Sequence, residues 1–181
     1  LDDIISHFKL SNFKLVGISM GAFVALQYQG TYGTDKISHY IVSRFIEENL
    51  LALRKQARVG DARTPLQDLI IEPQGTTHYL GPVALLTSMT TASAAEIFAL
   101  AMRERPNTIL VGERSAGGLS DQLLKTLPHG LFYTLSNEYY VSASGEEYEG
   151  QGIPVDIEQA FFTREQRETG ADLGLDSSIA W

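Results

Sequence analysis

A serine flanked by small residues, Ser93, stands where an apolar stretch gives way to a helical pattern. Residues 81–88 predict a buried strand, and the apolar positions after Ser93 recur at helical spacing up to Arg105 and Pro106. A helix N-terminus offers unpaired N–H groups and a partial positive charge, which can stabilise an oxyanion. The pattern therefore indicates a nucleophilic serine that attacks a carbonyl. The alternative is a plain N-cap, with Glu96 completing a capping box.

The elements around Ser93 predict a site at one edge of a parallel sheet. A β-branched run at residues 108–111 follows the helix and ends in the glycine-rich segment 112–118. Strand, helix and strand in this order predict a βαβ unit with a parallel pair. Because sites in open α/β sheets gather at the carboxyl ends of the strands, Ser93 and the glycine-rich segment are expected to meet there.

A second serine, Ser19, competes for the chemical role. The run Gly17-Ile18-Ser19-Met20-Gly21 follows a predicted strand and precedes a predicted helix, so residues 1–30 resemble the nucleophile elbow of α/β-hydrolases. Asp121 and His129 follow in the order that a triad of this fold requires. Few residues precede this elbow, however, whereas the hydrolase fold needs several earlier strands and the loop that donates the second oxyanion N–H.

Several separated motifs, in the right order, together resemble peptidase family S41, the family of the C-terminal processing and tricorn-core proteases. They lie at residues 81–88, 91–98, 112–118, 127–130, 132–136 and 148–156. The resemblance covers about residues 35–157 and implies an α/β fold, the ClpP/crotonase-like S41 catalytic core. We expect this core at residues 35–160, lacking its N-terminal part, with a helix–strand–glycine-turn segment at 1–34 and a helical tail at 161–181.

The resemblance also implies roles for individual residues. Ser93 would be the nucleophile, Ala94 and Gly33 would supply the oxyanion N–H groups, and Gly117 and Gly118 would line the substrate site. The processing-protease branch has its lysine base 25 residues after the serine, where this chain has Gly118. The chain therefore resembles the tricorn branch without lysine, in which a histidine is the base and a glutamate, here Glu149, orients the site.

The catalytic base is missing from the pattern. None of the four histidines matches the position that the family uses; they are His7, His39, His78 and His129. Lys125 is interpreted as a solvated surface charge. A serine without a base is a poor nucleophile at neutral pH. We therefore predict a serine endopeptidase that is incomplete as a single chain, with two alternatives: an esterase that uses Ser19, or a non-catalytic relative that binds ligands or partners.

The amino-acid composition limits the kinds of partner that the chain is expected to bind. The chain has 181 residues, 44% of them hydrophobic, no cysteine and a net charge of −8. The acidic balance disfavours binding to nucleic acid, the absence of cysteine excludes disulfides, and no spacing predicts a metal or a cofactor. The expected partner is a peptide or unfolded protein substrate, and a homo-oligomer or a partner that supplies a missing segment is also expected. The family resemblance alone favours an extracytoplasmic location.

Two further segments are expected to support the core. Leu51–Leu53 predicts a short strand, and residues 57–67, which contain glycine and proline, predict a loop.

Overall fold

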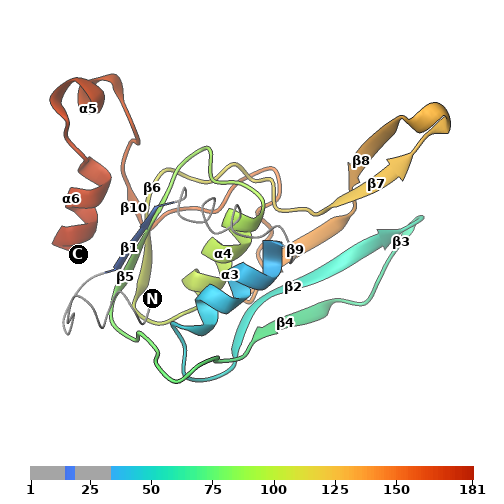
Figure 1. Cartoon of the computed structure of the whole chain (residues 1–181), viewed down its shortest axis with the longest axis horizontal. Helices are drawn as coiled ribbons and strands as arrows, with labels where there is room; N and C mark the ends of the chain where they lie inside the picture. The colour runs from blue at the N-terminus through green and yellow to red at the C-terminus, as the bar shows by residue number, and fades with distance from the viewer. Residues whose placement is uncertain (1–14, 19–33) are drawn as a thin grey trace.

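A parallel sheet forms the centre of the computed structural model, which describes residues 15–18 and 34–181 (Figure 1). The sheet has the strand order β1-β5-β6-β10, and its strands are β1 (Leu15–Ile18), β5 (Val83–Thr87), β6 (Thr108–Gly112) and β10 (Ile157–Glu158). All neighbouring pairs are parallel. Strand β5 is buried along its whole length, which explains its unbroken apolar sequence.

The predicted βαβ unit is confirmed. Helix α4 (Ala94–Arg103) follows β5, and β6 returns parallel to β5. The strand predicted before Ser19 is also present as β1, whose last residue, Ile18, pairs with Leu86 of β5. Strands β1 and β5 therefore end side by side, at the edge where the predicted site lies. Ser19 itself lies outside the described residues.

A second, antiparallel sheet corrects the prediction for residues 51–67. Strand β2 is longer than expected, and the predicted loop instead contains the end of β2, a tight turn, a short strand and the first residue of a further strand. These strands are β2 (Leu50–Val59), β3 (Ala62–Arg63) and β4 (Gln67–Ile71). Strand β2 also pairs with β9 (Glu138–Ser142), so Leu53, Arg54 and Lys55 have a strand on each side. Pairing between distant segments thus extends a strand that the local pattern does not predict.

Helices cover both faces of the parallel sheet. Helix α3 (Thr34–Ser43) packs against α4, and both lie between the parallel sheet and the β2 sheet (Figure 1). The main apolar core lies on this side and includes Leu53, Leu100 and Leu110. On the other face, α6 (Leu173–Ala180) contacts β5 and β6, after the short helix α5 (Arg164–Thr169).

A two-stranded hairpin projects from the body of the molecule (Figure 1). It consists of β7 (Gln122–Thr126) and β8 (Phe132–Ser136), joined by the short helix η1 (Pro128–Gly130). Every residue of both strands is exposed.

Candidate active site

Ser93 is exposed at the start of α4 and has an unusual backbone conformation, with φ 56° and ψ −128°. The predicted capping box with Glu96 is present. An ordinary N-cap residue, however, has an extended backbone with negative φ, and positive φ is uncommon for a residue other than glycine. Backbone strain of this kind concentrates at functional sites. The geometry therefore goes beyond capping and resembles a strained turn that presents a nucleophile.

The turn before Ser93 is held by its own side chains and by the glycine-rich segment. The Ser88 N–H donates to the Thr91 hydroxyl at 3.0 Å, and the Thr91 N–H donates to the Ser88 carbonyl at 2.9 Å. The Ala116 N–H donates to the Thr91 carbonyl at 2.9 Å. Because β5 enters this turn as a fully buried strand, the position of Ser93 is fixed from both sides.

Glu96 joins the turn at Ser93 to the glycine-rich segment. Its side chain is fully buried, and one carboxylate oxygen accepts hydrogen bonds from the Ser115 hydroxyl at 2.5 Å and the Gly117 N–H at 2.7 Å. The other oxygen accepts from the Gly118 N–H at 2.8 Å and the Ser93 N–H at 3.1 Å. A buried carboxylate is tolerated when its oxygens are satisfied in this way. Glu96 thus links the turn at Ser93 to the glycine-rich segment, and we call these four hydrogen bonds the Glu96 clamp.

The sequence identified Glu96 only as a capping residue. The signal of a further role was its place on the buried side of α4, among Ile97, Ala99 and Leu100. A carboxylate at such a position needs several donors. Ser115, the side-chain donor, was not singled out either.

The predicted substrate-binding glycines, Gly117 and Gly118, lie opposite Ser93. The Ser93 N–H donates to the Gly118 carbonyl at 2.9 Å, and the Gly150 N–H donates to the Gly117 carbonyl at 2.7 Å. Since Glu96 accepts from the N–H groups of both glycines, these groups hold the loop and are not offered to a ligand. Binding of substrate by this segment stays a prediction.

The loop at residues 148–153 supports the glycine-rich segment by close backbone contact. The Ile153 N–H donates to the Ser115 hydroxyl at 2.7 Å, and the Ser115 N–H donates to the Ile153 carbonyl at 3.2 Å. Gly152 has φ +78°, and a Cβ atom there would lie 2.1 Å from the Ser115 carbonyl oxygen. Only glycine fits at this contact.

Glu149 fixes the exit of the glycine-rich segment. One of its carboxylate oxygens accepts hydrogen bonds from the Leu119 N–H at 2.8 Å and the Ser120 N–H at 2.9 Å. The residue is otherwise exposed. Its observed contacts are therefore with the loop that faces Ser93, and its predicted role in orienting a base stays a prediction.

Of the two predicted oxyanion donors, Ala94 and Gly33, the structure describes only Ala94. The Ala94 N–H belongs to the first turn of α4, whose N–H groups have no partner one turn earlier in the helix. The Ser38 hydroxyl of α3 lies 3.5 Å from the Ala94 carbonyl oxygen, so α3 adjoins the start of α4. Gly33, the second predicted donor, lies outside the described residues.

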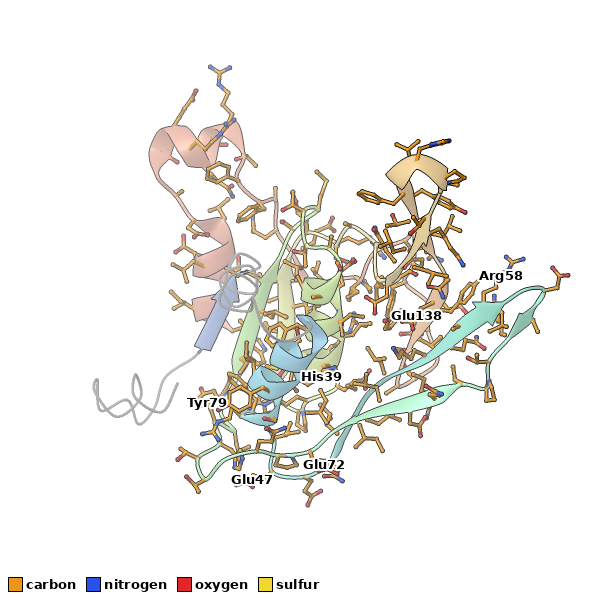
Figure 2. The ribbon with its side chains drawn as sticks, turned by 45° about the vertical axis from the view of Figure 1, so that its right-hand side comes forward. His39, Glu47, Arg58, Glu72, Tyr79 and Glu138 are labelled. Carbon is orange, nitrogen blue, oxygen red and sulfur yellow. The ribbon has the colours of Figure 1, made fainter. Side chains whose placement is uncertain are left out.

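No base for Ser93 is identified among residues 15–18 and 34–181. The structure shows no hydrogen bond there between the Ser93 hydroxyl and a histidine or lysine. His39 lies on α3 (Figure 2), and a ring nitrogen of His78 lies 3.1 Å from the Gln74 carbonyl oxygen. His129 and the exposed Lys125 belong to the projecting hairpin. His7 lies outside the described residues.

Tyr148, at the start of the supporting loop, gives a prediction for alkaline pH. Burial raises the pKa of the Tyr148 hydroxyl to about 12, and its hydrogen bond to Glu146 adds to the rise. A pKa above the ordinary value of 10.0 means that folding favours the neutral phenol. This contribution to stability is complete below pH 10.0 and is lost as the pH rises through about 12. Tyr148→Phe should remove this part of the pH dependence in urea unfolding, whereas Tyr133→Phe, on the exposed hairpin, should leave it unchanged.

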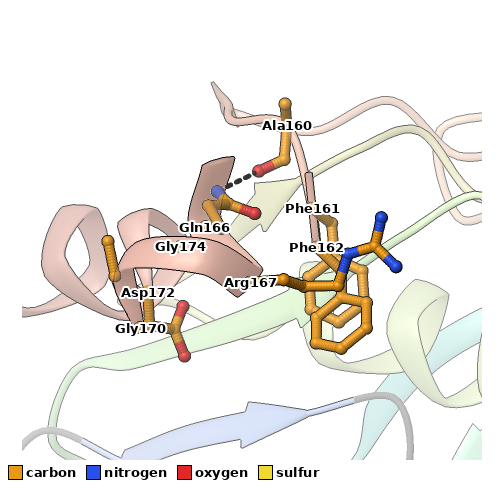
Figure 3. A pocket seen from close by; sticks show the side chains of 9 residues that line it. Ala160, Phe161, Phe162, Gln166, Arg167, Gly170, Asp172 and Gly174 are labelled. Carbon is orange, nitrogen blue, oxygen red and sulfur yellow. Dashed lines mark hydrogen bonds between the residues drawn. The ribbon is translucent and has the colours of Figure 1, made fainter. Parts of the chain in front are cut away.

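A pocket of about 380 Å³ lies at the C-terminal helices and contains none of the predicted site residues (Figure 3). The rings of Phe161 and Phe162 line it, and the Arg167 guanidinium lies 5.6 Å from the centre of the Phe162 ring. The Phe161 N–H donates to the Glu113 carboxylate at 3.1 Å, which ties this pocket to the end of β6.

The described residues offer neither a metal-ion cluster nor a membrane-spanning helix. No group of three or more histidine, cysteine or acidic side chains there could hold a metal ion. No helix there is long and apolar enough to cross a membrane.

The turn at Ser93 follows the parallel strand β5 and is held by Glu96 to the glycine-rich segment that follows the neighbouring strand β6. The model of peptidase family S41 matches residues 31–159. The chain therefore belongs to peptidase family S41, a family of serine-type peptidases. No curated protein sequence matches the chain.

Solved structures of S41 relatives share this fold. A putative peptidase from Parabacteroides merdae ATCC 43184 is 28% identical, with a TM-score of 0.73 over 82% of this chain and 47% of its own. The photosystem II D1 C-terminal processing protease is 16% identical, with a TM-score of 0.59 over 88% and 37%. The tricorn protease is 19% identical, with a TM-score of 0.57 over 80% and 13%. The chain thus spans less than half the length of each of these proteins.

Proposed function

We propose that the chain carries the nucleophile of an S41 serine endopeptidase of the tricorn-like branch, and that Ser93 is this nucleophile. The observation that supports the proposal most is the strained, exposed backbone of Ser93, held by the buried Glu96 clamp against the glycine-rich segment. A plain N-cap needs neither the positive φ nor the clamp.

The proposed reaction is acyl transfer to Ser93. The hydroxyl oxygen attacks the carbonyl carbon of a peptide bond, and its proton passes to a base. The Ala94 N–H donates to the oxyanion of the tetrahedral intermediate. The amine leaves with a proton from the protonated base, and water then hydrolyses the ester on Ser93. The base of this branch is a histidine.

Gly118 supports the tricorn-like branch. It occupies the position of the lysine base in the other branch, and its N–H is held by Glu96 at 2.8 Å. Lys125 does not replace that lysine, because it lies on the exposed strand β7. Substrates in the proposal are extended or unfolded polypeptides.

Proteolysis of an unfolded, fluorescently labelled protein tests the proposal. Ser93→Ala should abolish cleavage, a loss of at least about a thousandfold, because the attacking atom is removed. Ser19→Ala is the matched control and should retain activity. Loss of cleavage with Ser19→Ala alone would instead favour the hydrolase elbow, while cleavage that survives Ser93→Ala would refute the proposal.

A further inference from the structure

The outer end of the antiparallel sheet carries three arginines, although the chain as a whole is acidic. Arg54 and Arg58 lie on β2 and Arg63 lies on β3, in a chain of net charge −8. Residues two apart along a strand share a face of the sheet, and so do directly opposite residues of paired strands. Because Arg58 pairs with Arg63, all three arginines lie on the same face.

Two of these arginines repel each other across the β2–β3 pair. Arg58 and Arg63 are directly opposite in the register, and both are exposed. Like charges in this position destabilise a pair of strands. Among the described residues neither arginine forms an ion pair, although Asp61 lies in the turn that joins their strands. An anion bound by both arginines would remove this repulsion.

Tyr139 of β9 orders one of the two guanidinium groups. The Arg63 guanidinium lies 3.9 Å from the centre of the Tyr139 ring. Stacking on an aromatic face fixes an arginine and leaves the N–H groups along its edge able to bind an anion. Tyr139 is directly opposite Gln56, which lies between Arg54 and Arg58 on the same face of β2. We call the three arginines and Tyr139 the basic patch.

The carboxylates on the neighbouring strands are bound by other cations. Asp68 of β4 accepts a hydrogen bond from Arg54 at 2.9 Å. Glu138 precedes Tyr139 on β9 and therefore lies on the opposite face, where its carboxylate is 3.3 Å from the Lys55 ammonium. Within the described residues, the other two arginines of the basic patch have no such partner.

The basic patch lies within reach of a polypeptide bound at Ser93. The Arg58 N–H donates to the Asn137 carbonyl at 2.8 Å, and the N–H of the next residue donates to the Ser120 hydroxyl at 3.2 Å. Ser120 follows Gly118, whose carbonyl accepts the Ser93 N–H at 2.9 Å. These links place Arg58 (Figure 2) within about 30 Å of Ser93, a distance that about nine extended residues span.

We propose that the basic patch binds acidic side chains of the polypeptide substrate, up to about nine residues from the bond that Ser93 cleaves. This inference rests on the proposed function, which supplies the polypeptide. One arginine can donate two parallel N–H groups to a carboxylate, so two adjacent arginines suit a pair of acidic residues. The acidic remainder of the protein repels such a segment and confines it to the patch. A nucleic acid suits the patch less, because its long row of phosphates would also meet the acidic surface.

Fluorescence anisotropy with the Ser93→Ala chain tests the proposal without cleavage. The probe is a labelled, unstructured peptide with a cluster of Asp and Glu, compared with the same peptide carrying Asn and Gln in their place. The acidic peptide should bind at least about tenfold more tightly at low salt, and added salt should weaken its binding. Adding Arg63→Gln should raise its Kd about tenfold. Arg164→Gln is the matched control: it removes a charge from a side chain that is 85% exposed on α5, and the Kd should stay unchanged.

Three binding results would overturn the proposal: equal affinity for the two peptides, equal weakening by Arg63→Gln and Arg164→Gln, or tighter binding of a single-stranded oligonucleotide than of the acidic peptide. A lower Tm of the Arg63→Gln chain would also overturn it, because the patch would then be structural. Removing one of two opposed like charges should leave the Tm unchanged or raise it.

Cleavage by the chain with Ser93 intact shows whether the bound peptide is a substrate. The acidic peptide should have a lower KM than its neutral counterpart, and Arg63→Gln should remove the difference while kcat stays unchanged. Equal KM values for the two peptides would contradict the proposal. Absence of all cleavage would refute the proposed function instead, whereas the anisotropy measurements would still decide whether the basic patch binds acidic peptides.

Discussion

Replacing Glu96 by Gln is expected to abolish cleavage by Ser93 and to lower the free energy of unfolding by on the order of 3 kcal/mol. The carboxylate accepts four hydrogen bonds while it is fully buried. In glutamine an NH₂ group replaces one carboxylate oxygen, so the groups that donated to that oxygen would face another donor. Each buried donor left without an acceptor costs about 1–3 kcal/mol. Urea unfolding measures the stability, and the rate of cleavage by the folded protein measures the effect on the site.

Glu113→Gln is the control for this prediction. Its carboxylate also accepts two backbone N–H groups, from Met89 at 3.3 Å and Phe161 at 3.1 Å, but it is not bonded to Ser93 or to the glycine segment at 117–118. The variant should lose less stability and keep its activity. Equal effects of the two substitutions would show that Glu96 is an ordinary structural carboxylate.

Gly152→Ala is expected to be the most damaging change in the supporting loop. The added Cβ atom would lie 2.1 Å from the Ser115 carbonyl oxygen, closer than any van der Waals contact, and the φ of +78° disfavours alanine. The loop must move away from Ser115, which breaks the contacts that hold the Glu96 clamp. We expect a loss of several kcal/mol, measured by urea unfolding, together with loss of activity.

A substitution at the neighbouring Gly150 separates the cost of backbone strain from the cost of the steric clash. It has a similar φ of +71°, and a Cβ atom there meets nothing within 4 Å. Gly150→Ala should therefore cost only about 1 kcal/mol, the cost of the left-handed conformation. Similar losses for both variants would contradict the importance of the contact between Gly152 and Ser115.

The parallel core could be predicted because its signals are local. The apolar run of β5, the helical spacing of α4 and the β-branched run of β6 each lie in one stretch of sequence, and the structure has all three in the expected order. Ser93 could be singled out as a candidate for the same reason: it lies at the junction of two such elements.

The antiparallel sheet and the contacts of Glu96 depend on interactions between different segments of the chain, which no local pattern shows. The second half of β2 is polar, and it is a strand because other strands pair with it: Lys55 pairs with β4 and β9, residues 56–57 pair with β9, and residues 58–59 pair with β3. The Glu96 clamp likewise forms between residues about 20 positions apart, Ser115 to Gly118 on one side and Ser93 to Glu96 on the other. No local pattern shows which donors will surround a buried carboxylate, so the sequence gives Glu96 only its capping role.

Labelling with a fluorophosphonate, which forms a covalent adduct with activated serines, tests the central claim most directly. The purified chain is treated with the probe, and the adduct is located by peptide mass spectrometry in wild type, Ser93→Ala and Ser19→Ala. We predict an adduct on Ser93 that persists in Ser19→Ala and disappears in Ser93→Ala. An adduct on Ser19, or an adduct that persists in Ser93→Ala, would contradict the assignment of Ser93 as the nucleophile.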